Sequence, residues 1–242
     1  MNARDSLSFG EDAPLFEVMS TMRAMRRLKP DPVPPELIEK LIQAATYGPS
    51  GGNNQLYSFV VVTDREQIAR LTPVWQRIAH WYIATQSPPP HMDAGAWDRL
   101  VSALHYQADH FDDIPVLIIA CYELTPVLLR RMLHTPAKQL NGIRTLGRRN
   151  MAALRNFTRA FATAETASVY PGMQNLLLAA RALGLAATLT TWHVLLEQEV
   201  KAIFGIPRRI KTFAIIPVGW PAGNFGPISR RPPAEAIHWE RW

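Results

Sequence analysis

Residues 48–62, GPSGGNNQLYSFVVV, join a polar loop directly to an apolar strand. The first eight residues are glycine, proline, serine and carboxamide residues, so they offer backbone N–H groups, one hydroxyl and three side-chain amides. The valines that follow are typical of the interior of a sheet. This stretch therefore predicts a loop that presents hydrogen-bonding groups at the end of a buried strand.

The segments on either side predict further helices and strands. Apolar residues three and four apart predict a helix over 14–27, and a proline-rich break separates it from a helix over 35–47. Other helices are expected from about residue 65, around 73–86 and 97–111, and over 170–183 and 193–207. Other strands are expected at 114–123, 186–192 and 210–221. We expect one α/β or α+β domain over residues 1–242, with helices on both faces of a sheet.

Composition excludes several classes of protein. The chain has 242 residues, of which 48% are hydrophobic and 19% charged, so a substantial core is possible. Its single cysteine, Cys121, excludes an internal disulfide, and the apolar neighbours of Cys121 predict a buried thiol. We find no signal peptide and no apolar run of the roughly 18 residues that cross a membrane. A cytoplasmic protein without membrane attachment is therefore expected.

The formal net charge of +6 comes from one basic segment. No acidic residue lies between Glu123 and Glu165, whereas this interval holds eight lysines and arginines, all within residues 130–161. Such a segment could contact nucleic-acid phosphates, but it lacks the interleaved aromatic residues that single-strand binding favours. A solvated helix face or a subunit contact is the preferred interpretation, so nucleic acid is not the expected partner.

Common catalytic and cofactor motifs are missing from the sequence. It contains no GxGxxG after a strand, no GxxxxGK[ST], no HExxH and no GxSxG. His105 and Asp109 are four residues apart on a predicted helix, but no third ligand accompanies them, so no metal site is expected. We therefore assign no catalytic side chain from the sequence.

Two arginine clusters are better candidates for a binding site. On a helix, Arg23, Arg26 and Arg27 would lie close enough to converge, and Arg230 and Arg231 follow the last predicted strand. Guanidinium groups suit phosphate because they donate in a fixed fork. Taken singly, the first cluster could equally be a basic helix end, and the second could be soluble surface.

Three stretches in this order resemble the FMN-dependent nitroreductase family. They are residues 23–62, with the arginine cluster and the GPSGGNNQ loop; residues 173–191, MQNLLLAARALGLAATLTT; and residues 216–242, from IPVGWP to the C-terminus. The resemblance covers 14–72 and 166–242 well and 73–165 poorly. It implies a three-layer α+β fold, with a mainly antiparallel sheet flanked by helices, and a homodimer with two FMN molecules at its interface.

The resemblance also implies which residues bind FMN. A phosphate-binding start, a loop given by the partner subunit, a strand end beside the flavin ring and a C-terminal arginine would each contribute. In that order they are Arg23, Ala24, Arg26 and Arg27; Pro49, Ser50, Gly51, Asn53 and Gln55; Leu189, Thr190 and Thr191; and Arg230. The family often has R-x-S-x-R at its start, where this chain has Met22 for the first arginine and Ala24 for the serine, and Leu56 replaces a proline.

The implied activity is the reduction of a nitroaromatic, a quinone or another small-molecule acceptor, with NADH or NADPH as the electron donor. The flavin carries the redox chemistry, which agrees with the lack of catalytic motifs. Residues 73–165 would form a variable region that serves as a substrate lid or a dimer contact. Two alternatives are a family member that binds flavin with little turnover, and a basic nucleic-acid-binding protein that acts through residues 130–161.

Overall fold

The structure, a computed structural model, describes residues 7–123 and 157–242 of the chain. Its α-helices are α1 (Leu15–Thr21), α2 (Pro35–Thr46), α3 (Arg65–Thr85), α4 (Ala94–Asp109), α8 (Phe157–Ala182) and α9 (Glu197–Phe204). Short 3₁₀ turns lie at η1 (Gly51–Asn53), η2 (Phe111–Asp113), η3 (Trp192–Leu196) and η4 (Pro233–Glu235). The strands are β1 (Tyr57–Val62), β2 (Val116–Tyr122), β3 (Ala186–Ala187) and β4 (Lys211–Gly219).

These strands form an antiparallel sheet in the order β1-β2-β4-β3. Tyr57 of β1 lies opposite Tyr122 of β2, and Val116 of β2 lies opposite Val218 of β4. β2 is thus paired on both sides, and all seven of its residues are buried. The continuous apolar run at 114–123 is explained by this central position, since a strand covered on both faces needs no polar alternation.

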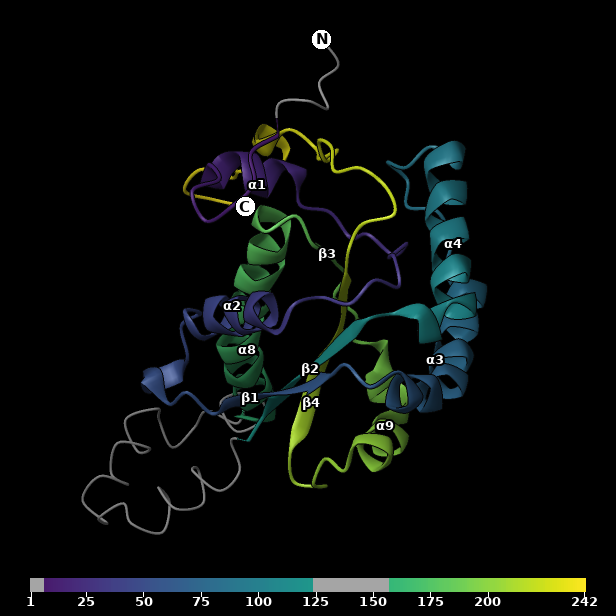
Figure 1. Cartoon of the computed structure of the whole chain (residues 1–242). Helices are drawn as coiled ribbons and strands as arrows, with labels where there is room; N and C mark the ends of the chain where they lie inside the picture. Colours follow the sequence, from purple (N-terminus) through teal and green to yellow (C-terminus); the bar gives the residue numbers. More distant parts are fainter. Residues whose placement is uncertain (1–6, 124–156) are drawn as a thin grey trace, which may run out of the picture.

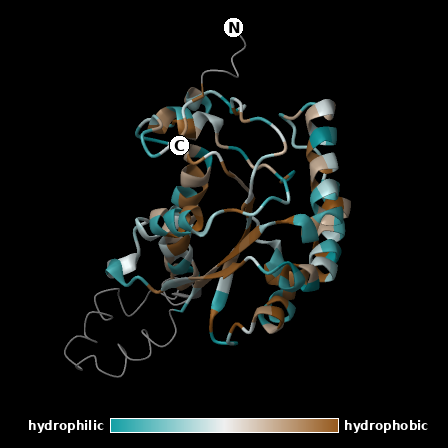
Figure 2. Cartoon of the chain, in the orientation of Figure 1, coloured by the Kyte–Doolittle hydropathy of each residue, from teal (hydrophilic) through white to brown (hydrophobic). Residues whose placement is uncertain are grey.

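Two hydrophobic cores lie on opposite faces of the sheet. Leu117, Ile119 and Cys121 point into the core formed with α3, α9 and η2. The alternate residues of β2 point into the core formed with α2 and α8. Figure 1 shows α2 and α8 on one side of the strands and α3, α4 and α9 on the other, and Figure 2 shows the strands at the centre as mostly hydrophobic. The predicted three-layer α+β fold is confirmed.

Several predicted elements have different bounds. The two helices expected from residue 65 and at 73–86 form the single helix α3, which continues through Pro73 because Leu71, Val74 and Trp75 all face the core. The strand predicted at 186–192 is regular only in β3. Beyond it, Thr188 and Thr190 make separate backbone hydrogen bonds to β4, and the helix predicted at 193–207 begins as η3.

Two glycines allow α2 and α8 to cross in close contact. A Cβ atom on Gly172 would lie 2.4 Å from the carbonyl oxygen of Ala45, and one on Gly48 would lie 2.4 Å from the Gly172 nitrogen. Since Gly48 begins the loop at 48–55, this crossing fixes where the loop leaves α2.

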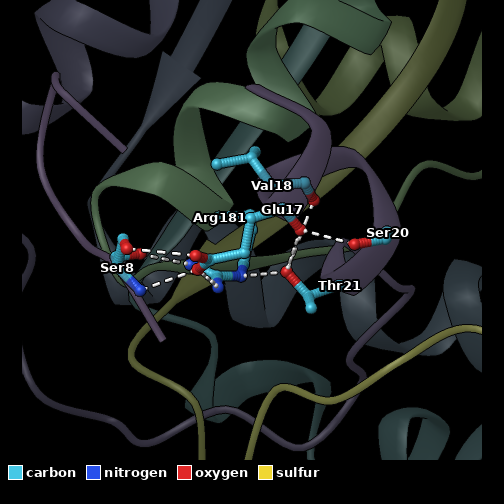
Figure 3. Close-up of polar contacts among 6 residues, drawn as sticks. All are labelled: Ser8, Glu17, Val18, Ser20, Thr21 and Arg181. Atoms are coloured by element: carbon cyan, nitrogen blue, oxygen red, sulfur yellow. Dashed lines mark hydrogen bonds and ion pairs between the residues drawn. The ribbon is translucent and has the colours of Figure 1, made fainter. Parts of the chain in front are cut away.

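A buried arginine holds the N-terminal segment onto α8. Arg181 is 1% exposed, and its Nε donates to the Thr21 hydroxyl at 2.8 Å. Its two terminal nitrogens donate to the Ser8 carbonyl oxygen at 3.2 Å and to Glu17 Oε1 at 3.3 Å. Figure 3 shows these groups converging on one guanidinium from α1 and from the residues before it. The end of α1 is therefore fixed against the last turns of α8.

The same guanidinium lies between two aromatic rings. Its central carbon is 4.9 Å from the ring centroid of Phe9 and 4.8 Å from that of Phe225. Since Phe225 follows β4, Arg181 joins three parts of the chain that are distant in sequence.

The remaining sequence-based expectations meet the structure only in part. Cys121 is buried, as expected, and burial raises the pKa of its thiol to about 11. None of the helices in the described ranges combines the length and the apolarity that a bilayer span requires. Most of the basic segment 130–161 lies outside the described residues, as does the later part of the variable region 73–165.

We expect Gly172→Ala to destabilise the protein by about 2 kcal/mol, because the added methyl group meets a backbone carbonyl that cannot move freely. Urea unfolding measures this change. Gly226→Ala is the control, since nothing lies within 4 Å of its Cβ position. Equal stability of the two variants would contradict the close crossing of α2 and α8.

Candidate functional site

The segment 22–28, which follows α1, is extended rather than helical. Its backbone bonds to other parts of the fold, since Met25 N–H donates to the Ala187 carbonyl and Ala222 N–H donates to the Arg27 carbonyl. Met25 and Leu28 point into the core. The predicted helix over 14–27 is therefore wrong beyond Thr21, because sheet-like hydrogen bonds and two buried apolar side chains outweigh the helical spacing.

This extended segment forms one wall of a basic cavity of about 610 Å³, here called the arginine cavity. The segment contributes residues 23–27, α4 contributes Asp98, Arg99, Ser102 and Ala103, and the chain after β4 contributes residues 222–224. Four guanidinium groups thus face one carboxylate. Such a charge balance favours an anionic ligand.

A second cavity of about 160 Å³, here called the threonine cavity, adjoins the first at Arg26. Residues 188–192 form one side, and aromatic and amide side chains of α3 and α4 form the other, including Trp75, Tyr82 and Gln107. Thr190 is fixed by two backbone hydrogen bonds with Ile215, at 3.0 and 2.9 Å. The threonine cavity therefore has one rigid polar side and one aromatic side.

Arg26, which lines both cavities, has an unsatisfied donor. Its Nε is buried without a hydrogen-bond partner among the described residues, and burial lowers the pKa of its guanidinium. Trp75 Nε1 and Gln107 Nε2 are likewise buried without a partner in that part of the chain. Unpaired buried donors are costly, so acceptor groups of a ligand would stabilise them. FMN fits this donor set, because it combines an anionic phosphate with a ring that carries several acceptors.

The loop at 48–55 is strained and polar. Asn53 and Gln55 have φ values of 51° and 50°, a left-handed backbone conformation that residues other than glycine rarely adopt. The Ser50 hydroxyl accepts from Gln55 N–H at 3.1 Å, and Gln55 Nε2 donates to Asn53 Oδ1 at 3.3 Å. Non-glycine residues held in this region are concentrated at functional sites, which favours a binding role for the loop.

Within one chain the loop does not reach the cavities. Gly51 N–H donates to the Ser168 hydroxyl at 3.0 Å. The segment 22–28, here called the arginine segment, begins next to Thr21, which Arg181 contacts. These two contacts on α8 are thirteen residues apart, or about 20 Å along a helix. Neither cavity is lined by a described residue of the loop.

The structure therefore divides the predicted site residues into three groups. The first group lines the two cavities together and comprises Arg23, Ala24, Arg26, Arg27, Leu189, Thr190 and Thr191. The second is the loop, with Pro49, Ser50, Gly51, Asn53 and Gln55. Arg230 forms the third: it is exposed and donates to the Ser229 carbonyl at 2.8 Å, in a tail that Ile228 N–H attaches to Ser20.

Sequence reasoning missed the residues that α3 and α4 contribute. Arg99, Trp75, Tyr82 and Gln107 all lie in the region 73–113, which carries no recognisable motif. The three-residue spacing of Arg99 and Ser102 is the only sequence signal that they share a helix face.

A buried polar cluster supports the residues after Thr191. His193 is fully buried, and its Nε2 lies 3.0 Å from the Thr212 hydroxyl. That hydroxyl and the Thr212 N–H both donate to Glu197 Oε1, which also pairs with Lys201 at 2.9 Å. Burial lowers the pKa of His193 to about 4, so the imidazole is neutral at neutral pH.

The fold and the cavities together define an α+β protein with a basic site at one edge of its sheet. Buried hydrogen-bond donors in this site lack acceptors among the described residues. The model of the Nitroreductase family matches residues 20–220, so the chain belongs to this family of oxidoreductases.

Individual relatives and solved structures are similar to this chain in sequence or in fold. An NADH dehydrogenase of Thermus thermophilus is 27% identical over 90% of this chain and 91% of its own length. A nitroreductase with bound FMN from Desulfitobacterium hafniense has a TM-score of 0.58, with 16% identity over 93% of this chain and 98% of that chain. An oxidized iodotyrosine deiodinase bound to FMN and 3-iodo-L-tyrosine has a TM-score of 0.61, with 19% identity over 90% of this chain and 96% of that chain.

The buried state of His193 predicts a loss of stability in acid. Because its pKa falls from 6.5 in the unfolded chain to about 4 in the folded chain, protonation favours unfolding as the pH falls between these values. We expect the free energy of unfolding to fall by about 3 kcal/mol over this window.

Denaturant unfolding at several pH values measures this loss. His193→Gln keeps a side-chain donor for Thr212 but cannot gain a charge at this pH, so its profile should be flatter than that of the wild type. The lowered pKa of Glu197 adds a slope in the same direction at lower pH, which both proteins share. Parallel profiles above pH 4 would contradict the assignment to His193.

Proposed function

We propose that the protein is an FMN-dependent oxidoreductase that takes electrons from NADH or NADPH and passes them to a nitroaromatic, a quinone or a related small molecule. The observation that carries the proposal is the meeting of the two cavities at Arg26. One cavity is basic enough for a phosphate, and the other has the rigid polar edge and aromatic walls that suit a flavin ring.

The chain's residues bind and orient the cofactor in this proposal. Arg23, Arg26 and Arg27 hold the phosphate, and Ala24 leaves room beside them. Arg230 of the tail lines neither cavity within its own chain and is proposed as a further phosphate ligand. Leu189, Thr190 and Thr191 present backbone and hydroxyl groups to the ring edge, opposite the aromatic side chains of the threonine cavity. FMN, when bound, supplies the hydride-transfer chemistry, so the protein needs no catalytic side chain.

We propose a homodimer in which each flavin site takes its loop from the partner subunit. Within one chain the loop lies away from both cavities, although its polar and strained residues favour binding. The single chain also exposes apolar side chains of α1, with Leu15 59%, Phe16 83% and Met19 45% exposed. Apolar surface of this kind favours contact with a second protein surface.

Three observations support the choice of donor and acceptor. The Thermus thermophilus relative is an NADH dehydrogenase by name, which supports a nicotinamide donor. Beside the threonine cavity, the ring centroid of Trp192 lies 5.4 Å from that of Trp81 and 5.1 Å from that of Tyr82. A flat aromatic electron acceptor could therefore stack on these rings. One related structure holds 3-iodo-L-tyrosine, so halogenated phenols should be among the electron acceptors that are tested.

The absorption spectrum of the purified protein tests the proposal directly. We expect a yellow protein with an oxidised-flavin spectrum, which NADH or NADPH bleaches without oxygen and which a nitroaromatic, quinone or iodophenol restores. A colourless protein that binds no added FMN would contradict the proposal and favour the nucleic-acid alternative. A yellow protein that neither donor bleaches would favour flavin binding with little turnover.

Mixed dimers test the shared site. Arg26→Ala and Asn53→Ala should each weaken FMN binding by roughly tenfold to a hundredfold, as expected for the loss of a charge-assisted or buried hydrogen bond. In a dimer of one Arg26→Ala subunit and one Asn53→Ala subunit, one site has both changes and the other has neither. Differently tagged subunits, purified as the mixed dimer, should therefore bind half as much FMN tightly as the wild type does.

Each variant as a homodimer is the control, because all of its sites carry one change. If the mixed dimer binds no more FMN than the two homodimers, arginine and loop act within one chain. A monomer that keeps one FMN per chain would exclude the shared site as well.

A further inference from the structure

Helix α4 forms a wall of the arginine cavity, although no sequence motif marks it. Arg99 and Ser102 are three residues apart, and Tyr106 is four residues further on, so the three side chains lie on one face of the helix. Arg99 and Ser102 line the same cavity as Arg23, Arg26 and Arg27. The face of α4 that carries these residues is thus directed toward the arginine segment.

This face of α4 contacts Arg27 at two points. Arg27 Nη2 donates to the Ser102 hydroxyl at 3.3 Å, and the guanidinium carbon lies 5.0 Å from the ring centroid of Tyr106. A serine acceptor and an aromatic face both orient a guanidinium group without neutralising its charge. Arg27 is therefore positioned by α4 and remains available to an anion.

The described residues compensate the charge of the cavity only in part. None of the ion pairs in the described ranges includes Arg23, Arg26, Arg27 or Arg99, and Asp98 is the only carboxylate among the lining residues. Like charges around one cavity repel each other, so an anion with two charges would relieve more repulsion than an anion with one.

The arginine segment itself has few side-chain donors between its arginines. Met22, Ala24 and Met25 cannot donate a side-chain hydrogen bond, and Met25 is buried in the core. Arg99 brings a further guanidinium from outside the segment, on the side of the cavity that residues 23–27 do not occupy.

We propose that Arg99 of α4 binds the phosphate group of FMN, and that Ser102 and Tyr106 position Arg27 for the same group. This inference rests on the proposed function, since it assigns the cofactor's phosphomonoester to the arginine cavity. It makes α4 a part of the cofactor site, so this part of the region 73–165 is more than a substrate lid or a dimer contact.

Comparison of FMN with riboflavin isolates the phosphate. Dissociation constants of both flavins are measured by flavin fluorescence for the wild type, Arg99→Gln and Arg70→Gln at one salt concentration. Arg70 is an exposed arginine of α3 that lines neither cavity, so it controls for the loss of one positive charge. Arg99→Gln should weaken FMN binding about tenfold and leave riboflavin binding unchanged, while Arg70→Gln changes neither.

Two further variants separate the roles on α4. Arg99→Lys should recover part of the FMN affinity, because it restores the charge without the fork. Ser102→Ala should weaken FMN binding by less than Arg99→Gln does, and again without effect on riboflavin.

The outcomes distinguish this inference from the proposed function. If the wild type prefers FMN to riboflavin and Arg99→Gln keeps that preference, Arg99 does not bind the phosphate and the inference fails alone. If Arg99→Gln raises the KM for NADPH but leaves FMN binding unchanged, the cavity wall serves the donor's phosphate, which also overturns it. A wild type that binds neither flavin would overturn the proposed function itself.

Discussion

The candidate site depends on the burial of one guanidinium group, that of Arg181. Its nitrogens hold α1 through Thr21 and Glu17, while its faces hold Phe9 and Phe225. Thr21 immediately precedes the arginine segment, and Phe225 follows the residues that close the arginine cavity. Two walls of that cavity are thus positioned by one side chain of α8. A buried cation can have this role only because every part of it has a partner.

Arg26, which is partly buried, shows the opposite arrangement. Burial lowers the pKa of its guanidinium, yet its Nε has no partner among the described residues. The contrast with Arg181 separates a structural arginine from one suited to a ligand, since a fold does not gain stability from an unpaired buried donor. Trp75 and Gln107 repeat this pattern on the other side of the threonine cavity. Three of the five buried side-chain atoms that lack a partner in the described ranges therefore lie where we propose that FMN binds; Thr72 Oγ1 and His193 Nδ1 lie outside the two cavities.

The loop at 48–55 has backbone strain that its own chain does not compensate. The close crossing of α2 and α8 and the Ser168 hydroxyl fix the start of the loop, and left-handed Asn53 and Gln55 shape its end. No described residue of the loop lines either cavity of its own chain, so nothing in these cavities compensates the strain of the loop. A second subunit would give the loop a ligand to contact, and the exposed apolar residues of α1 provide surface for such an association. The dimer and the shared site are thus one proposal.

The sequence by itself determined the layers of this protein and the family. Apolar periodicity predicted the helices that cover the sheet, the continuous run at 114–123 predicted a buried strand, and the order of the motifs indicated the nitroreductase family, because these signals are local. Tertiary structure alone decided the conformation of Arg23–Arg27, since backbone hydrogen bonds with Ala187 and Ala222 outweigh a helical spacing that residues 14–27 satisfy equally well. It alone also brought Arg99 of α4 to the same cavity. Such a meeting depends on how α4 packs beside the sheet, which no local pattern records.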